Sequence, residues 1–473
     1  MKTQRSPKGS APASRIRPAK DLPVINRHAA GVDISSTDHW VCVPEDSVPT
    51  GQSPVRKFGA FTQDLDHLVE WLRKCGVTTV AMESTGKYWI ALYEKLEAAE
   101  FEVILVNARD IKHVPGRKTD MLDCQWIQLL HSYGLLSASF RPAQDIRRLR
   151  VLLRHRSNLV IQLGQEVQHM QGALDEMNIH LHQVVSDLDG DTGFRILDAI
   201  LGGQRDPEAL VLLRDERIRK STPQEMKAAL RGDWQDEQLF ILQQARHTYQ
   251  WVQKQIDQCD ERILQLLPSI KCNPVVVAQE DRPPNPVGVS PTKKKKKTKG
   301  NAPKYDFTAE LMRICGIDLT QVVGLNILSV LMLISEIGVD MSHWRSAKAF
   351  ASWLGLCPGS KISGGKPLSS RSRRVSNRVS ILLRNLAPTI GRTETWLGIF
   401  HRRMRRRLGP AGANTATAHK LACLIYHLLK YKEGYIDVDR LVYEEKFRHQ
   451  RIARLRKQAE ELGLEVVAKT NPA

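Results

Sequence analysis

Long apolar runs are missing from this sequence. A membrane-spanning helix needs roughly 18 to 20 consecutive apolar residues, and no stretch of the 473 residues approaches that length. The first twenty residues also lack an apolar core and hold six basic residues and three prolines instead. They cannot form a secretory signal, and a disordered basic tail is a simpler interpretation than an organelle transit peptide. We therefore expect no membrane partner and a cytoplasmic location.

Paired cysteines are absent as well. The eight cysteines are scattered along the chain, and no two of them form a C-x-x-C pair. Zinc ribbons and disulfide-stapled domains both depend on clustered cysteines, so neither class of protein fits. We expect all eight side chains to be reduced thiols.

Acidic residues are scarce relative to basic ones. The chain holds 70 Lys and Arg against 51 Asp and Glu, which leaves a net charge of +19. Residues 361–410 hold thirteen basic residues and a single acid, Glu394. A solvated surface usually mixes both signs, so this excess predicts a nucleic-acid surface. The side chains predicted to bind phosphates are Lys118, Lys361, Lys366, Arg371, Arg373, Arg374 and Arg378.

Changes in pattern divide the chain into six predicted parts. Two meander strands and then strand–helix–strand units predict an α/β domain near the N-terminus, and helical spacing dominates later. The parts are a disordered basic tail (1–24), an α/β catalytic domain (25–145), a helical coiled-coil region (146–270), a Pro/Lys-rich linker (271–306), a mostly α-helical C-terminal domain (307–432), and a charged helix with a polar tail (433–473).

Two heptad seams mark the helical region. Apolar residues from Leu163 to Met177 are spaced 4, 3, 4 and 3, and those from Leu242 to Leu266 alternate between spacings of 3 and 4. Such spacing predicts coiled-coil-like helices. It does not identify the chain that supplies the partner helix, so an intramolecular hairpin and a dimerisation arm fit equally well.

Four acidic residues end predicted strands or open a predicted helix. Asp33 and Glu83 each come at the end of an apolar strand, where α/β domains usually bind ligands. Asp120 and Asp123 stand three residues apart at a helix start, so both point the same way. Carboxylates are suitable ligands for Mg²⁺, and a pair of such ions stabilises phosphoryl transfer. Each acid taken alone also fits a helix cap or a turn.

Ser363 lies in a basic, glycine-rich segment that reads GSKISGGK at 359–366. Glycines permit sharp turns and the close approach of a phosphate. A serine in such a setting is a candidate covalent nucleophile if another group takes its proton. From composition alone, a polar glycine-rich loop that only cradles the DNA backbone is the better interpretation.

Three further segments carry a recognisable pattern. They read AMESTGKYW at 81–89, GRKTDMLDCQW at 116–126, and WLGLCP at 353–358 followed by SGG at 363–365. In this order, and with Gly31-Val32-Asp33 before them, they resemble the DEDD transposases of the insertion sequence one-ten family, which are relatives of the Piv DNA invertases. The resemblance covers roughly residues 28 to 465, with Cys124 where the family commonly has alanine.

The resemblance has implications that spacing alone does not. It implies a RuvC-like, RNase H-type N-terminal domain that binds Mg²⁺ through Asp33, Glu83, Asp120 and Asp123, although Mn²⁺ accepts the same ligands. It implies that Ser363 forms a phosphoserine link to DNA, with Ser360 as the alternative nucleophile. It also implies a homodimer or homotetramer in the bacterial cytoplasm, and a structured guide RNA that leaves sequence choice to base pairing.

Three functions are consistent with these observations. The first is a transposase that cuts and rejoins DNA with the four acids and Ser363. The alternative is a RuvC-like, structure-selective DNA endonuclease that uses water as nucleophile and needs only the acids. A third is a non-enzymatic nucleic-acid-binding protein on a decayed nuclease scaffold, which the presence of all four acids disfavours.

Overall fold

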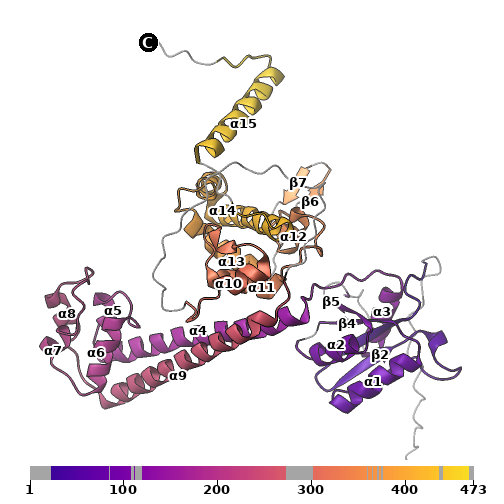
Figure 1. The fold of residues 1–473 in the computed structure, drawn as a ribbon, viewed down its shortest axis with the longest axis horizontal. Helices are drawn as coiled ribbons and strands as arrows, with labels where there is room; N and C mark the ends of the chain where they lie inside the picture. The colour runs from indigo at the N-terminus through magenta and orange to yellow at the C-terminus, as the bar shows by residue number, and fades with distance from the viewer. Residues whose placement is uncertain are drawn as a thin grey trace, which may run out of the picture. The chain divides into compact units, whose positions relative to one another are not determined.

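The computed structural model describes residues 23–84, 86–107, 111, 120–272, 302–359, 361–364, 366–369, 372–373, 377–435 and 440–467. The chain divides into two compact units between Arg141 and Pro142. Each unit has its own buried apolar core, and Figure 1 labels most of the helices and strands of both. The finer division into six parts stays a prediction.

The N-terminal unit is built on a mixed sheet of five strands in the order β3-β2-β1-β4-β5. β1 pairs antiparallel with β2, and β2 with β3, whereas β4 runs parallel to both β1 and β5. The predicted meander followed by strand–helix–strand units is therefore confirmed. The strands are β1 (Ala29–Ile34), β2 (Asp38–Cys42), β3 (Val55–Gly59), β4 (Thr79–Glu83) and β5 (Glu102–Val106).

Helices cover both faces of this sheet. Side chains alternate between the two faces along a strand, so Val32 and Met82 share a core with α1 (Thr62–Lys74) and α2 (Trp89–Ala98). Ala81 faces the other way and packs with Ile127 of α3 (Asp120–Ser132). A short 3-10 helix, η1 (Glu45–Ser47), follows β2. A mixed sheet between helices makes this unit an α/β structure, as predicted.

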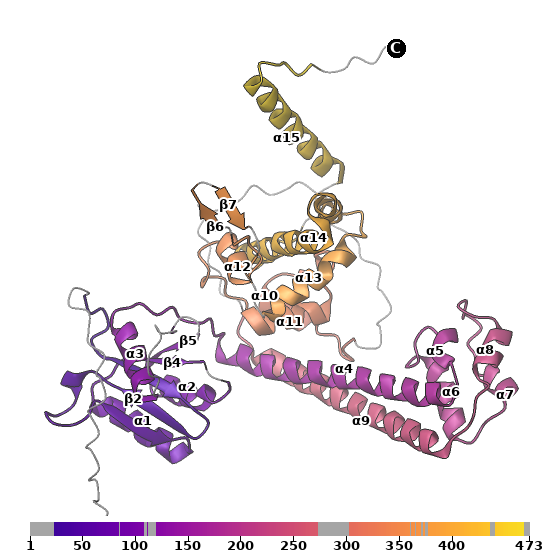
Figure 2. The ribbon, with the colours of Figure 1, turned by 180° about the vertical axis from the view of Figure 1, so that it is seen from behind.

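Two long helices, α4 (Gln144–Glu176) and α9 (Asp236–Leu266), lie side by side in the second unit (Figures 1 and 2). The predicted seams meet between them in one buried cluster, so the same chain supplies the partner helix. This packing accounts for both seams without a second copy of the protein, and the oligomeric state stays a prediction. The seam residues in the cluster are Leu163, Met170, Leu174, Met177, Leu242, Ala245, Tyr249, Val252, Ile256 and Cys259.

Four short helices connect α4 to α9. Two of them begin where the local sequence favours it, with a capping side chain followed by proline at the first helical position. Asp206 accepts hydrogen bonds from the backbone of α7, and Thr222 forms a capping box with Glu225 in α8. The helices are α5 (Leu181–Val184), α6 (Asp191–Leu201), α7 (Pro207–Val211) and α8 (Pro223–Ala229), and η2 (Leu267–Ser269) follows α9.

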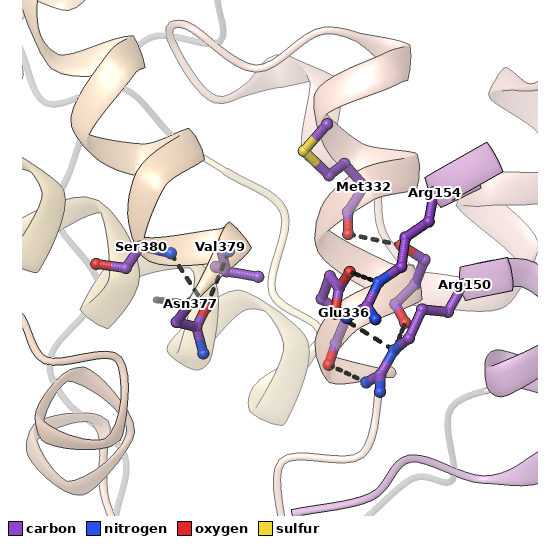
Figure 3. Close-up of polar contacts among 8 residues, drawn as sticks. Arg150, Arg154, Met332, Glu336, Asn377, Val379 and Ser380 are labelled. Carbon is purple, nitrogen blue, oxygen red and sulfur yellow. Dashed lines mark hydrogen bonds and ion pairs between the residues drawn. The ribbon is translucent and has the colours of Figure 1, made fainter. Parts of the chain in front are cut away.

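The rest of the second unit is mostly helical, as predicted. Arg154 of α4 binds the Glu336 carboxylate through two hydrogen bonds of 2.8 Å, and Arg150 donates to the Ser335 and Glu336 carbonyls near the end of α11 (Figure 3). Cations suit a helix C-terminus, where carbonyls lack partners. The helices are α10 (Thr308–Cys315), η4 (Leu319–Gln321), α11 (Ile327–Ile337), α12 (Ala347–Trp353), α13 (Arg378–Ile390), α14 (Trp396–Tyr431) and α15 (Arg440–Glu461).

A β-hairpin interrupts these helices where the composition favours a plain glycine-rich loop, and that expectation was wrong. β6 (Lys361–Ser363) pairs antiparallel with β7 (Lys366–Ser369), and Ser363 stands opposite Lys366. Strands of three and four residues are too short to reveal themselves by alternation. The signal that was available is Gly364-Gly365, because a two-residue Gly-Gly connection is typical of a tight hairpin.

Candidate active site

Helix α3 lies very close to β1 because residue 31 is glycine. An ideal Cβ atom at Gly31 would stand 2.2 Å from the backbone nitrogen of Gln128 and 2.5 Å from the carbonyl oxygen of Cys124. Gln128 also donates a hydrogen bond of 3.3 Å from Nε2 to the carbonyl oxygen of Ala29. Gly31 therefore sets the depth at which α3 packs on the sheet.

Alternate residues of β4 face α3 in an ordered series. Thr79 Oγ1 lies 2.9 Å from Nε2 of His131 near the end of the helix. Two residues along the strand, Ala81 packs with Ile127, which is four residues earlier in the helix. Two strand residues advance the chain by about 6.6 Å and four helical residues by about 6 Å. Continued by one more step, this series predicts Glu83 at the level of Asp123.

Asp33 continues a similar series on β1. It follows Gly31 by two residues, so its side chain lies on the α3 face of the sheet. The parallel register pairs Val32 with Met82, which makes Asp33 and Glu83 the next residues on two neighbouring strands. The two carboxylates and the first turn of α3 thus lie at one end of one face of the sheet.

Cys124 is buried on the side of α3 that packs against Gly31 of β1. Burial raises the pKa of its thiol, and the negative charge of Asp33 raises it further. The thiol donates to the carbonyl oxygen of Met121 at 3.2 Å. Cys124 therefore stays protonated and packs as a small buried side chain. Alanine, which is common at this position in the family that the segment resembles, is also small and uncharged.

The structure describes the side chains of three of the four predicted acids. Asp33, Glu83 and Asp123 are partly exposed, and the backbone of Asp120 begins α3 while its side chain lies outside the described part. Among the described side chains, no three His, Cys, Asp or Glu residues form a group that could hold a metal ion. The four-acid metal site stays a prediction.

The buried His131 should make the N-terminal unit sensitive to acid. Burial lowers the pKa of its imidazole from the usual 6.5 to about 4. Thr79 donates to the Glu102 carbonyl at 3.1 Å, so Nε2–H of neutral His131 donates to Thr79. Below about pH 6.5 the unfolded chain binds a proton that the folded chain does not. The free energy of unfolding should therefore fall by about 1.4 kcal/mol per pH unit from about pH 6.5 to 4, and the contribution is fully present above that window.

His131→Asn tests this expectation. Urea unfolding of both proteins between pH 4 and 8 should give a flatter profile for the variant below pH 6.5. Other histidines titrate in both proteins, so the difference between the two profiles is the measurement. Equal slopes would show that His131 is not the group responsible.

Ser363 is exposed at the end of β6, directly before Gly364, whose φ of 54° lies in the left-handed region. The alternative nucleophile, Ser360, lies outside the described residues. Two arginines hold the preceding segment in place. Arg373 donates to the Ser352 carbonyl at 3.1 Å, and Arg384 donates to the Gly355 carbonyl at 3.2 Å. Arg384 was predicted only as part of the basic excess, because a bond to a distant carbonyl has no local signal.

The predicted phosphate-binding side chains can be assessed only in part. Arg373 and Arg378 are exposed, and Arg378 begins α13, which Asn377 caps through the backbone nitrogens of Val379 and Ser380 (Figure 3). Arg373 is only partly available to bind a phosphate, because its guanidinium group donates to the carbonyl oxygen of Ser352. Lys361 and Lys366 lie on β6 and β7 but their side chains are not described, and Lys118, Arg371 and Arg374 lie outside the described residues.

Two family models match the chain over the segments just described. Residues 30–179 match the DEDD model of IS110 (insertion sequence one-ten) elements, described as a transposase, and residues 318–398 match the model described as the transposase IS116/IS110/IS902 family. The chain belongs to the IS110 family of transposases. The first match contains Asp33, Glu83, Asp120 and Asp123, and the second contains Ser363. A search of curated proteins finds no match.

Membership of the IS110 family makes this chain a transposase that acts on DNA in transposition and recombination. Its net charge of +19 suits that substrate. Within the described residues, no helix of this IS110 transposase is long and apolar enough to cross a membrane. The family assignment does not specify the mechanism of strand cleavage, which depends on residues of the two matched segments.

Proposed function

We propose that this transposase cuts and rejoins DNA with a Mg²⁺ site made by Asp33, Glu83, Asp120 and Asp123 and with Ser363 as the nucleophile. The observation that carries the proposal is the placement of Asp33 and Glu83 as neighbours on parallel strands, on the face that α3 covers. Asp123 belongs to the first turns of that helix, and Asp120 begins it. Four acids from three elements then share one end of the sheet.

The donor chemistry fits a hard divalent cation. Carboxylate oxygens are the ligands that Mg²⁺ prefers, and Mn²⁺ accepts them as well. Asp33, Glu83 and Asp123 are partly exposed, so a phosphate can reach them. When bound, the metal supplies positive charge that stabilises the oxygens of the reacting phosphate. The role of the chain is to hold its carboxylates on the sheet and the helix, from which their side chains would reach a bound ion.

The exposed position of Ser363 supports its role as nucleophile. Its Oγ atom would attack a DNA phosphorus, forming a phosphoserine ester while the bond to one deoxyribose oxygen breaks. The leaving oxygen takes a proton, and a base must accept the proton of the serine hydroxyl. Attack on the ester by the hydroxyl of another strand end then reverses these steps and releases Ser363. One phosphoester bond replaces another at each stage, so no energy source is required.

The proposal extends to fold class, partners and assembly. The strand order, with antiparallel β1, β2 and β3 and parallel β4 and β5, supports an RNase H-like, RuvC-type domain. The basic excess of the chain supports a structured guide RNA as a second polyanionic partner besides DNA. Action as a homodimer or homotetramer in the bacterial cytoplasm completes the proposal.

Covalent trapping tests the chemistry. The protein is purified with its RNA and incubated with Mg²⁺ and labelled element-junction and target DNA, and a labelled protein band is sought after denaturation. We expect the band in the wild type and in Ser360→Ala, and its loss in Ser363→Ala and Asp33→Asn. The rate of strand joining should fall on the order of a thousandfold or more in Ser363→Ala and in Asp33→Asn, because the serine and the carboxylate act in one reaction step.

Two outcomes would contradict the proposal. Cutting without an adduct, and unchanged in Ser363→Ala, would favour the endonuclease that uses water. Loss of the band in Ser360→Ala and its retention in Ser363→Ala would transfer the nucleophile to Ser360. Circular dichroism spectra of all variants show whether each variant is folded.

A further inference from the structure

A cavity of about 240 Å³ lies beside a kink in α14. The kink is at Gly409, whose φ of 72° and ψ of 178° are not helical, and Pro410 follows it. Proline cannot continue the hydrogen-bond ladder of the preceding turn. The cavity is lined by Arg392, Arg402, Arg405, His401 and Asn414, together with glycine and proline, and among the described residues no carboxylate lines it.

His401 is the buried polar group of this cavity. The residue is only 5% exposed, and its Nδ1 atom has no hydrogen-bond partner among the described residues. Gly391 packs against the ring so closely that an ideal Cβ there would stand 2.8 Å from Cδ2. Buried polar atoms are almost always hydrogen-bonded in native proteins. The imidazole ring lines the cavity, so a ligand bound there can reach the ring.

The three arginines have different roles. Arg402 donates from Nη1 to the carbonyl oxygens of Gly391 and Thr393, at 3.1 and 2.7 Å, and so holds the turn that forms one wall. Arg392 and Arg405 are exposed, and within the described chain their guanidinium groups make no hydrogen bond or ion pair. Two guanidinium groups are thus available to a ligand, and one is committed to the structure.

The size and charge of the cavity indicate its ligand. Small-molecule pockets usually measure about 300–1,000 Å³, so this cavity suits one oxyanion better than a whole nucleotide. Guanidinium groups bind phosphate oxygens in pairs of parallel hydrogen bonds. The chain carries a net charge of +19 and belongs to a family that acts on DNA, so the oxyanion is a phosphate of a polyanion and not a free ion.

We propose that the cavity of Arg392, His401 and Arg405 binds one phosphate group of a nucleic-acid backbone. The proposal rests on the proposed function only in that the transposase binds nucleic acid. The imidazole of neutral His401 donates to one phosphate oxygen, and the two free guanidinium groups bind the others. Burial lowers the pKa of His401, and the charges of Arg405 and Arg402 lower it further, so the imidazole is neutral near pH 8 before binding.

Binding to short fluorescent oligonucleotides tests the site, with fluorescence anisotropy measured in EDTA at pH 8. Single-stranded DNA, duplex DNA and RNA of one sequence distinguish the source of the phosphate, and inorganic phosphate serves as competitor. We expect Arg405→Gln to weaken binding about tenfold, as for loss of a charge-assisted hydrogen bond. The slope of the logarithm of its binding constant against the logarithm of salt concentration should become smaller in magnitude by about 0.7 to 0.9.

Arg406→Gln is the matched control, because it removes the same charge from the next residue of α14. We expect it to weaken binding by about twofold at most, as for an exposed charge. His401→Phe keeps the ring volume and changes no charge at pH 8, and should weaken binding by roughly threefold to tenfold. In the double variant His401→Phe/Arg405→Gln the two losses should not multiply, because both groups bind the same phosphate.

Three results would overturn the proposal. The first is an equal loss of oligonucleotide affinity in Arg405→Gln and Arg406→Gln. The second is a double variant whose loss of affinity equals the product of the two single losses. The third is tight competition by inorganic phosphate alone. Because EDTA prevents cleavage, these measurements do not depend on the acidic site. If the wild type binds DNA or RNA through the cavity but forms no covalent adduct with Mg²⁺, the cleavage chemistry fails and the phosphate site stands.

Discussion

Gly31→Ala should destabilise the N-terminal unit by about 3 kcal/mol or more and should abolish strand cleavage. The added methyl group would stand 2.2 Å from the backbone nitrogen of Gln128, and backbone cannot rotate away as a flexible side chain can. Overpacking of this kind typically costs about 1–3 kcal/mol, and more where backbone must move. Since α3 carries Asp120 and Asp123, its displacement also separates them from Asp33 and Glu83. Urea unfolding and the trapping assay measure the two effects.

Gly172→Ala is the control for this substitution. Gly172 lies within α4, and an ideal Cβ there meets no atom within 4 Å. Alanine favours a helix over glycine by about 0.8–1.0 kcal/mol, so the same chemical change should raise stability at this position and leave cleavage intact. A Gly31→Ala protein as stable and active as the wild type would show that α3 can shift without effect on the acidic site.

Asp260→Ala should destabilise the α4–α9 hairpin by about 3–5 kcal/mol. The Asp260 carboxylate accepts two hydrogen bonds from Arg156, of 2.5 and 3.1 Å, and their side chains are 1% and 3% exposed. The pair lies between the two long helices, where neither charge reaches water. Removing one partner leaves a buried guanidinium without its carboxylate, which is far more costly than loss of an exposed pair. Urea unfolding followed by circular dichroism measures the loss.

Asp257→Ala provides the comparison on the same helix. Asp257 pairs with Lys304 at 3.5 Å, and its side chain is 38% exposed, so its loss should cost less than about 1 kcal/mol. The double variant Arg156→Met/Asp260→Leu should recover most of the stability lost in Asp260→Ala, because apolar side chains can replace a buried ion pair. Equal losses in Asp257→Ala and Asp260→Ala would contradict the assigned importance of the buried pair.

Much of the N-terminal unit was predictable from local pattern. The apolar runs that lead to Asp33 and Glu83 predicted β1 and β4. The strand assignment in turn predicted that Asp33 and Glu83 end their strands, and the helix assignment put Asp120 and Asp123 at the start of α3. These predictions succeed because the two faces of a strand or helix leave a regular imprint on the sequence.

Other features depend on residues that are distant in the sequence and so leave no such imprint. The heptads show that α4 and α9 each need a partner, but only the folded chain shows that they pack on each other. Gly31 looks like any glycine until the backbone of α3 is seen against it. His401 is one residue in a basic run, and only the kink of α14 and the turn at Gly391 make it the buried wall of a cavity.

The sequence by itself determined the family and most strands and helices of the N-terminal unit, and it predicted the chemical nature of two sites, because periodicity, charge and motif spacing are properties of neighbouring residues. The tertiary structure decided which helices pair, how closely α3 approaches β1, and that Ser363 ends a hairpin strand. The physical reason is that packing distance and burial arise from contacts across the chain. Such contacts are absent until segments that are far apart in the sequence meet in the folded protein.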